Sequence, residues 1–213
     1  MRKELSYVRI EGSLGGSQDW LRERDMHRGG CAAVTACDLC IHLALHDGSR
    51  CLYPYDVERL DKESFIRFAQ DMKPYLAPRY HGVDFLEIYL CGLSQYWHDT
   101  GYAGMRAEGL AGSAPFAAAE EAIRSQLDAG LPIPYLMLYH QDPALGDLEW
   151  HWFNLIGYED VSDGLLVEVV TYGEPQWIGL RQLWETGEER RGGLIRLQRR
   201  GVPMDALEGG DLA

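Results

Sequence analysis

The stretch RGGCAAVTACDLCIHLALH, residues 28–46, decides the fold of the first half of the chain. Its apolar residues recur mostly at steps of three and four, which predicts a helix from about Cys31 to His46 that ends at Gly48. Cys31 follows two glycines and opens this helix. Unpaired N–H groups at a helix N-terminus favour a thiolate, and two glycines leave room for a substrate backbone. Cys31 is therefore a candidate nucleophile, and a cysteine that merely fills the core is the alternative.

Three more helices are expected, over about residues 62–73, 83–97 and 115–130. The first carries an apolar stripe and is expected to close at Pro74. The last has Ser113 as a candidate cap. Between them, the glycine-rich segment 101–115 lacks the lysine of a phosphate-binding loop, so a flexible lid or substrate-entry loop is expected there.

From about residue 131 the sequence changes character. Short segments rich in β-branched and aromatic residues alternate with turn residues, which is typical of a mostly antiparallel sheet. The segments are LPIPYLMLYH, LEWHWFNLIGYED, GLLVEVVTYG, QWIGLRQLW and GGLIRLQRRG. The arginines around the last one favour a solvated edge strand. Helices followed by strands predict one α+β domain over residues 1–213, with a helical half over about 18–130, a β half over about 131–200 and a frayed tail over about 203–213.

The charge of the chain narrows its partners. Lys and Arg number 20 against 33 Asp and Glu, so the net charge is −13. Such a surface repels nucleic acid and anionic membranes. No segment has the pattern of a signal peptide or of a spanning helix, and the odd count of five cysteines favours free thiols. A cytoplasmic protein that contacts neither nucleic acid nor membrane is expected, and the oligomeric state is left open.

A cysteine nucleophile needs a general base, which is most often a histidine. Of the seven histidines, His151 lies in the predicted strand EWHWFNLIGYED of the β half. A histidine among aromatic strand residues is usually a satisfied core residue. Its role as a base therefore depends on whether the fold brings it to Cys31.

A second reading of the same helix is a zinc or redox site. Its candidate residues are Cys37, Cys40, His42 and His46. On a helix, positions 37 and 42 point about 140° apart, so the four side chains cannot hold one metal. A C-x-x-C pair inside a helix also lacks the N-terminal position that lowers a thiol pKa. No metal and no cofactor is expected.

Three motifs, in this order, resemble those of the papain-like cysteine peptidases, and especially the bacterial double-glycine leader peptidases that process bacteriocins. The first is GGSQDW with GGCAAVTACDLCIHLA, the second AIRSQLDAGLPIPYLMLYH, and the third HWFNLIGYED with LLVEVVTYGE. Together they span about residues 15–174. The resemblance implies a helical lobe built round the Cys31 helix, a twisted antiparallel sheet that carries His151, and a cleft between them. It also implies a Cys31–His151 thiolate–imidazolium pair, and an oxyanion site formed by the Gln18 amide and the Cys31 backbone N–H.

Two departures from the family pattern matter. The interval between Gln18 and Cys31 is longer than usual, so the intervening residues must form an extra turn. Where the family has an Asp or Asn that orients the histidine, this chain has Val170. The candidates to replace it are Thr171, Glu168, Glu174 and Asn154, and strand alternation turns Asn154 away from His151.

These features predict a cysteine hydrolase, a peptidase or amidase, that acts on a peptide or amide through a thioester acyl-enzyme. The same residues would serve a transferase that passes the acyl group to an amine. The missing Asp or Asn favours a second class of function, a catalytically degenerate module whose cleft binds a peptide. A structural or redox protein that uses Cys37 and Cys40 is a third reading.

Overall fold

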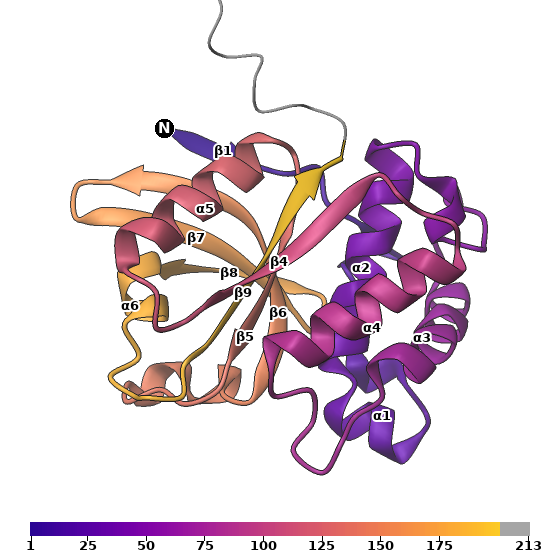
Figure 1. Cartoon of the computed structure of the whole chain (residues 1–213), viewed down its shortest axis with the longest axis horizontal. Helices are drawn as coiled ribbons and strands as arrows, with labels where there is room; N and C mark the ends of the chain where they lie inside the picture. The colour runs from indigo at the N-terminus through magenta and orange to yellow at the C-terminus, as the bar shows by residue number, and fades with distance from the viewer. Residues whose placement is uncertain (201–213) are drawn as a thin grey trace, which may run out of the picture.

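The protein has a mixed α+β architecture, seen in a computed structural model that describes residues 1–200 (Figure 1). Helices α1 to α4 gather on one side of an antiparallel sheet, and α5 and α6 lie against its other face. The α+β class expected from the sequence is thus confirmed. The predicted frayed tail, about residues 203–213, lies outside the described residues.

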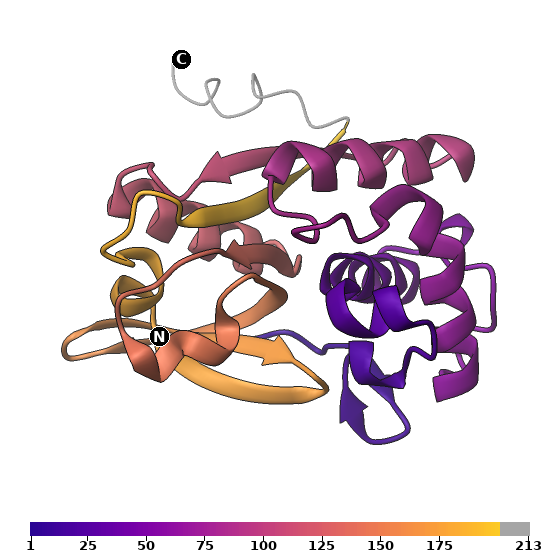
Figure 2. The same ribbon diagram turned by 90° about the horizontal axis from the view of Figure 1, so that it is seen from below.

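Helix α2 (Cys31–His46) is the central element of the helical part, and its bounds match the prediction. Fourteen of its 16 residues are buried, because it packs on α3 (Lys62–Leu76) on one side and on β6 (His151–Val161) on the other. Figure 2 shows α2 nearly end-on between these two neighbours. A helix covered on all sides can hold a residue at its first turn in a fixed position relative to the sheet.

The other helices agree with the prediction in place and differ at their ends. Helix α3 continues through Pro74 to Leu76, because a proline near the last turn costs one hydrogen bond only. Helix α4 covers Leu86–Asp99 and α5 covers Phe116–Asp128. Ser113 does not cap α5: the N-cap is Pro115, and no side chain bonds the free N–H groups there. Helix α1 (Arg24–Gly29) supplies the extra turn expected between Gln18 and Cys31.

The main sheet of the described residues has seven strands in the order β4-β9-β5-β6-β7-β8, with β1 paired to β6 beside this path. The strands are β1 (Arg2–Glu4), β4 (Met105–Ala111), β5 (Ile133–Met137), β6, β7 (Gly164–Thr171), β8 (Glu174–Gly179) and β9 (Gly192–Arg199). The pairings among these strands are antiparallel, as predicted. A short hairpin, β2 (Arg9–Ile10) with β3 (Ser13–Leu14), leads from β1 to the helices.

Three expectations about segments of the sheet and its connections are wrong. The segment 101–115 is no flexible lid, since it contains β4, which pairs with β9 along its length. Its Gly109 lies against the Leu86 side chain of α4, so the glycine permits close packing rather than a loop. Strand β9 lies between β4 and β5 and is not an edge strand. The segment QWIGLRQLW ends as helix α6 (Leu180–Trp184) after β8.

Two hydrophobic clusters lie on the two faces of the sheet. Strand β6 alternates between them: Trp152 and Ile156 pack toward α2, and Phe153 and Leu155 pack toward α5 and α6. The alternation predicted for this strand therefore holds. Among residues 1–200, no helix combines the length and the apolar character needed to span a membrane.

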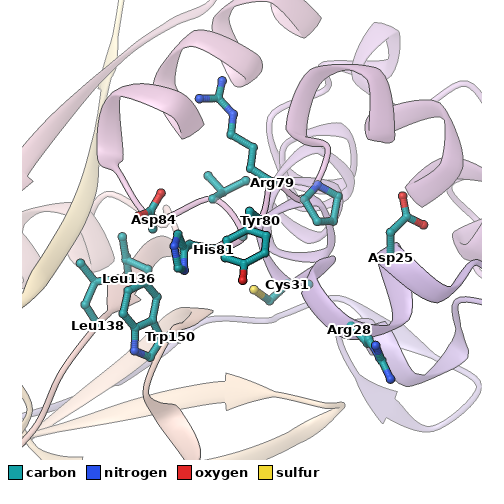
Figure 3. A pocket seen from close by; sticks show the side chains of 14 residues that line it. Asp25, Arg28, Cys31, Arg79, Tyr80, His81, Asp84, Leu136, Leu138 and Trp150 are labelled. Carbon is teal, nitrogen blue, oxygen red and sulfur yellow. The ribbon is translucent and has the colours of Figure 1, made fainter.

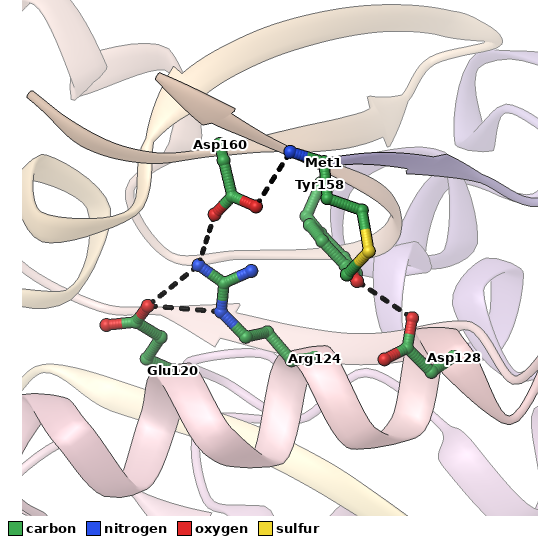
Figure 4. Close-up of polar contacts among 6 residues, drawn as sticks. All are labelled: Met1, Glu120, Arg124, Asp128, Tyr158 and Asp160. Carbon is green, nitrogen blue, oxygen red and sulfur yellow. Dashed lines mark hydrogen bonds and ion pairs between the residues drawn. The ribbon is translucent and has the colours of Figure 1, made fainter. Parts of the chain in front are cut away.

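The N-terminus is tied to the sheet and to α5 by charges (Figure 4). The Met1 ammonium is 3.0 Å from Asp160, and the Arg124 guanidinium bridges Asp160 at 2.5 Å and Glu120 at 2.9 Å. These cations lower the pKa of Asp160 to about 2. Strand β1 is thus held beside β6, and the chain that follows it runs toward Gln18.

Candidate active site

Cys31 is the first residue of α2, and Gly30 joins it directly to α1. A Cβ at Gly30 would lie 2.4 Å from the Met26 carbonyl oxygen, and one at Gly29 would lie 3.1 Å from Pro78. Gly30 is therefore needed where α1 meets α2, whereas a Cβ at Gly29 would require Pro78 to shift by only a few tenths of an ångström. Gly29 lines a cavity beside Cys31, and the expectation that the two glycines leave room for a substrate stays a prediction.

His151 is the first residue of β6 and is buried. Its Nε2 lies 2.6 Å from the Thr171 hydroxyl oxygen at the end of β7. The ring stacks on that of Tyr172, with centroids 5.0 Å apart and planes 4° apart. Within residues 1–200, the His151 ring makes this one hydrogen bond, through Nε2. Its Nδ1 has no partner there and can face another group.

A β-bulge explains why Thr171, and not Val170, meets the histidine. The pairing of β6 with β7 shifts register between Leu155 and Gly157, and beyond the shift Asn154 pairs with Val170. Directly paired residues share a face, so Val170 lies on the Asn154 face and Thr171 on the His151 face. A one-residue change of register would exchange the two.

The other three candidates for orienting His151 either bond to other groups or lie elsewhere. Asn154 donates from Nδ2 to the Tyr7 hydroxyl at 2.8 Å and to the Thr35 carbonyl at 3.3 Å. Glu168 pairs with Gly157, beyond the bulge, and Glu174 is exposed at the start of β8. Of the four substitutes proposed from the sequence, Thr171 is the one that contacts His151.

Gln18 begins a 3₁₀ turn, Gln18–Trp20, that is capped by the Ser17 hydroxyl. Its Nε2 donates to the Tyr172 hydroxyl at 3.2 Å, and its buried Oε1 has no hydrogen-bond partner among the described residues. The preceding backbone is fixed by Asp38 on α2, whose carboxylate accepts from the Gly16 N–H at 2.9 Å.

The fold brings together the three residues singled out in the sequence. Gln18, Cys31 and His151 line one small cavity, together with Thr171 and Tyr172. No hydrogen bond joins the Cys31 thiol to the His151 ring within residues 1–200. The three residues are therefore neighbours, and a proton transfer from Cys31 to His151 would require a closer approach.

Burial shifts the pKa values of Cys31 and His151. It raises the pKa of the Cys31 thiol, against the opposing effect of the backbone N–H groups of Trp152, Ala32 and Cys31 itself. It also lowers the pKa of His151 to about 4. Both groups are thus neutral near pH 7, in contrast to the thiolate–imidazolium pair that the resemblance implies.

A larger cavity of about 440 Å³ opens beside Cys31 (Figure 3). The sulfur of Cys31 points toward the wall formed by Leu136, Leu138 and Trp150. The segment 78–84 also lines this cavity, and the ring of its His81 lies 5.9 Å from that of Trp150. Of the acids that line this cavity, Asp25 is paired with Lys73 at 2.7 Å and Asp84 with Arg190 at 3.2 Å.

The C-x-x-C segment gives no metal-binding arrangement. Cys37 and Cys40 are buried free thiols, and His42 Nε2 bonds the Gly130 carbonyl at 2.9 Å. Within the described part of the chain, no group of three or more metal-ligating side chains converges.

Asp38 is a site residue that the sequence reasoning missed. It lies seven residues after Cys31, hence on the same face of α2, and lines the same cavity. Burial raises its pKa to about 7. The available signal was a single acidic residue in an otherwise apolar helix run.

Comparison of the chain with protein-family models, with curated proteins and with solved structures found no match. The case for a function therefore rests on the geometry described above.

Proposed function

We propose that this protein is a cysteine hydrolase with a papain-like fold, acting on peptide or amide bonds. The observation that carries the proposal is the 2.6 Å contact of His151 Nε2 with Thr171 Oγ1. A proton on Nε2 that is donated to this oxygen leaves the lone pair on Nδ1, the nitrogen able to accept a proton from Cys31. Thr171 would thus take the part of the Asp or Asn that the sequence lacks.

The chemistry follows from these positions. Cys31 Sγ attacks the carbonyl carbon while its proton passes to His151 Nδ1, and the oxyanion accepts N–H groups from the Cys31 backbone and the Gln18 amide. The C–N bond breaks, His151 returns the proton to the leaving amine, and a thioester forms. Water, deprotonated by His151, then attacks the thioester carbonyl and releases the acid and the free thiol.

The cavity beside Cys31 supports a peptide or amide substrate. Its volume of about 440 Å³ accommodates a side chain next to the scissile bond, and its wall of Leu136, Leu138 and Trp150 is apolar. Attack by an amine instead of water would make the same site a transferase.

A degenerate peptide-binding module is the second candidate, and one observation favours it. Burial leaves both Cys31 and His151 neutral, without a hydrogen bond between them among the described residues. In such a protein the cavity would bind a peptide, and Cys31 would have no special reactivity.

Alkylation by iodoacetamide, mapped to each cysteine by mass spectrometry, separates the two candidates. The enzyme requires that Cys31 react at pH 7 and that His151→Ala slow this reaction at least about tenfold, because the base no longer removes the thiol proton. The exposed Cys51 and Cys91 are internal controls whose rates stay unchanged. A Cys31 rate that is insensitive to His151→Ala would contradict the proposed hydrolase and favour the binding module instead.

Acylation by p-nitrophenyl acetate tests the next step. Wild-type protein should release p-nitrophenol through an acyl group on Cys31 and turn over. Cys31→Ala should remove this activity while leaving the slow acylation of Cys51 and Cys91. Equal rates for the two proteins would contradict the proposed hydrolase.

A further inference from the structure

Tyr172 contacts both the base and the oxyanion donor of the proposed site. Its ring stacks on His151 at 5.0 Å, and its hydroxyl accepts a hydrogen bond from Gln18 Nε2 at 3.2 Å. It follows Thr171 directly, at the turn between β7 and β8. Thr171 therefore contacts the His151 imidazole by a hydrogen bond and Tyr172 by stacking. Tyr172 also contacts the Gln18 amide.

The backbone at Tyr172 is in an unfavourable conformation for its residue type. Its φ is 53°, and that of Gly173 is 83°, so both central residues of this turn are left-handed. Glycine, asparagine and aspartate favour such turns, whereas a bulky side chain there costs about 1 kcal/mol or more. A tyrosine in this place is explained if its side chain has a task that a small turn residue cannot perform.

The Gln18 amide has two N–H donors on the same nitrogen. One is taken by the Tyr172 hydroxyl, so the other can point in a single fixed direction. A free glutamine side chain samples several rotamers, and fixing it costs entropy at the moment of reaction. An amide that is already anchored can meet the oxyanion without this loss.

We propose that Tyr172 is a positioning residue for the oxyanion site: its hydroxyl anchors the Gln18 amide so that the second N–H faces the oxyanion formed at Cys31. This inference rests on the proposed hydrolase function. The stacked ring also keeps the His151 imidazole parallel to a fixed plane, so the donor and the base are held by one side chain.

The test compares two reactions of Cys31 that differ in one respect. Acylation by p-nitrophenyl acetate passes through an oxyanion, whereas alkylation by iodoacetamide does not. Tyr172→Phe keeps the stacked ring and removes the hydroxyl. It should slow acylation about tenfold and leave the alkylation rate and its pH dependence unchanged. Gln18→Ala should slow acylation about a hundredfold, the size of effect typical of a lost oxyanion donor.

The double variant decides whether the hydroxyl acts through Gln18. Adding Tyr172→Phe to Gln18→Ala should cause no further loss, because the hydroxyl then has no amide to hold. Tyr139→Phe is a matched control, since Tyr139 is exposed to 40% against 41% for Tyr172 and lies near the site without contacting Gln18 or His151. Its acylation rate should equal that of the wild type.

Each result bears on one claim. If wild-type Cys31 is not acylated, the proposed function fails and this inference fails with it. If the wild type is acylated and Tyr172→Phe matches it, the inference alone is wrong. It is equally wrong if alkylation slows as much as acylation, or if the double variant multiplies the two losses, because the hydroxyl would then act independently of Gln18.

Discussion

Thr171 contributes a hydroxyl where a carboxylate or an amide orients the histidine in the family that the sequence resembles. A hydroxyl oxygen can accept a hydrogen bond from the Nε2–H and so fix the ring tautomer, but it carries no charge to stabilise an imidazolium. This matches a site in which His151 has a lowered pKa and starts neutral. The residue thus favours positioning of the base over stabilisation of its charged form.

We expect Thr171→Val to slow p-nitrophenyl acetate acylation of Cys31 about tenfold, because the isosteric side chain fills the same space without holding Nε2. Thr171→Ser, which keeps the hydroxyl, should retain most of the rate. Stopped-flow release of p-nitrophenol measures both. A valine variant as fast as the wild type would show that the 2.6 Å contact has no part in the reaction.

The same residue shows where prediction from sequence stopped. Cys31, His151 and Gln18 could be singled out because each lies in a short motif or at the start of a helix. The choice among Thr171, Glu168, Glu174 and Asn154 could not be made, because it depends on one register shift between β6 and β7. Alternation gives the face of a residue within its own strand, and pairing between strands is not a local property.

At the scale of elements, the loop that carries Gln18 is held by α2 and α3 together. Gly16 donates its N–H to the Asp38 carboxylate, and a Cβ at Gly16 would lie 1.9 Å from the Phe65 ring. The loop therefore passes between α2 and α3 in close contact with both. Such a close contact fixes the backbone two residues before Gln18.

We expect Gly16→Ala to lower the free energy of unfolding by about 1–3 kcal/mol, since the aromatic ring or the loop must shift. Acylation of Cys31 should also slow, because Gln18 moves with the loop. The matched control is Gly146→Ala: an added Cβ there meets nothing within 4 Å, so stability should stay the same. Urea titration followed by tryptophan fluorescence measures both, and equal stability of the two variants would contradict the packing argument.

The sequence predicted whether a segment is a helix or a strand better than it predicted where the segment lies in the sheet. The step pattern of α2 and the alternation of β6 are local, and both were read correctly from the sequence. The glycines of segment 101–115 predict a loop, and this prediction is wrong because Gly109 lies against α4 within a strand. The position of β9 inside the sheet was equally hidden, since its arginines indicated an exposed edge.

For the molecule as a whole, three buried titratable side chains make stability depend on pH. Asp38 is buried and has its pKa raised to about 7, while His42 and His151 are buried and have theirs lowered to about 4. The folded protein therefore binds the Asp38 proton more tightly than the unfolded chain does, and the two histidine protons less tightly. As the pH rises, the Asp38 effect therefore lowers the free energy of unfolding, whereas the histidine effect raises it.

The contribution of Asp38 can be isolated by Asp38→Asn. Between about pH 4, where the carboxyl titrates in the unfolded chain, and about pH 7, the folded state holds the extra proton, so stability falls as pH rises. Over this window the loss is on the order of 4 kcal/mol. The histidines have the opposite effect between about pH 4 and 6.5, and it is common to wild type and variant.

We therefore expect the free energy of unfolding of Asp38→Asn, relative to that of the wild type, to increase from pH 5 to pH 8. The asparagine oxygen can still accept from the Gly16 N–H. Urea unfolding at the two pH values measures the difference, and Asp163→Asn, at an exposed position between β6 and β7, is the control that should show no such shift. A difference that stays constant with pH would mean that Asp38 is ionised at its ordinary pKa in the folded protein. The cavity beneath Cys31 would then contain a permanent negative charge, which would oppose thiolate formation and favour the binding module over the hydrolase.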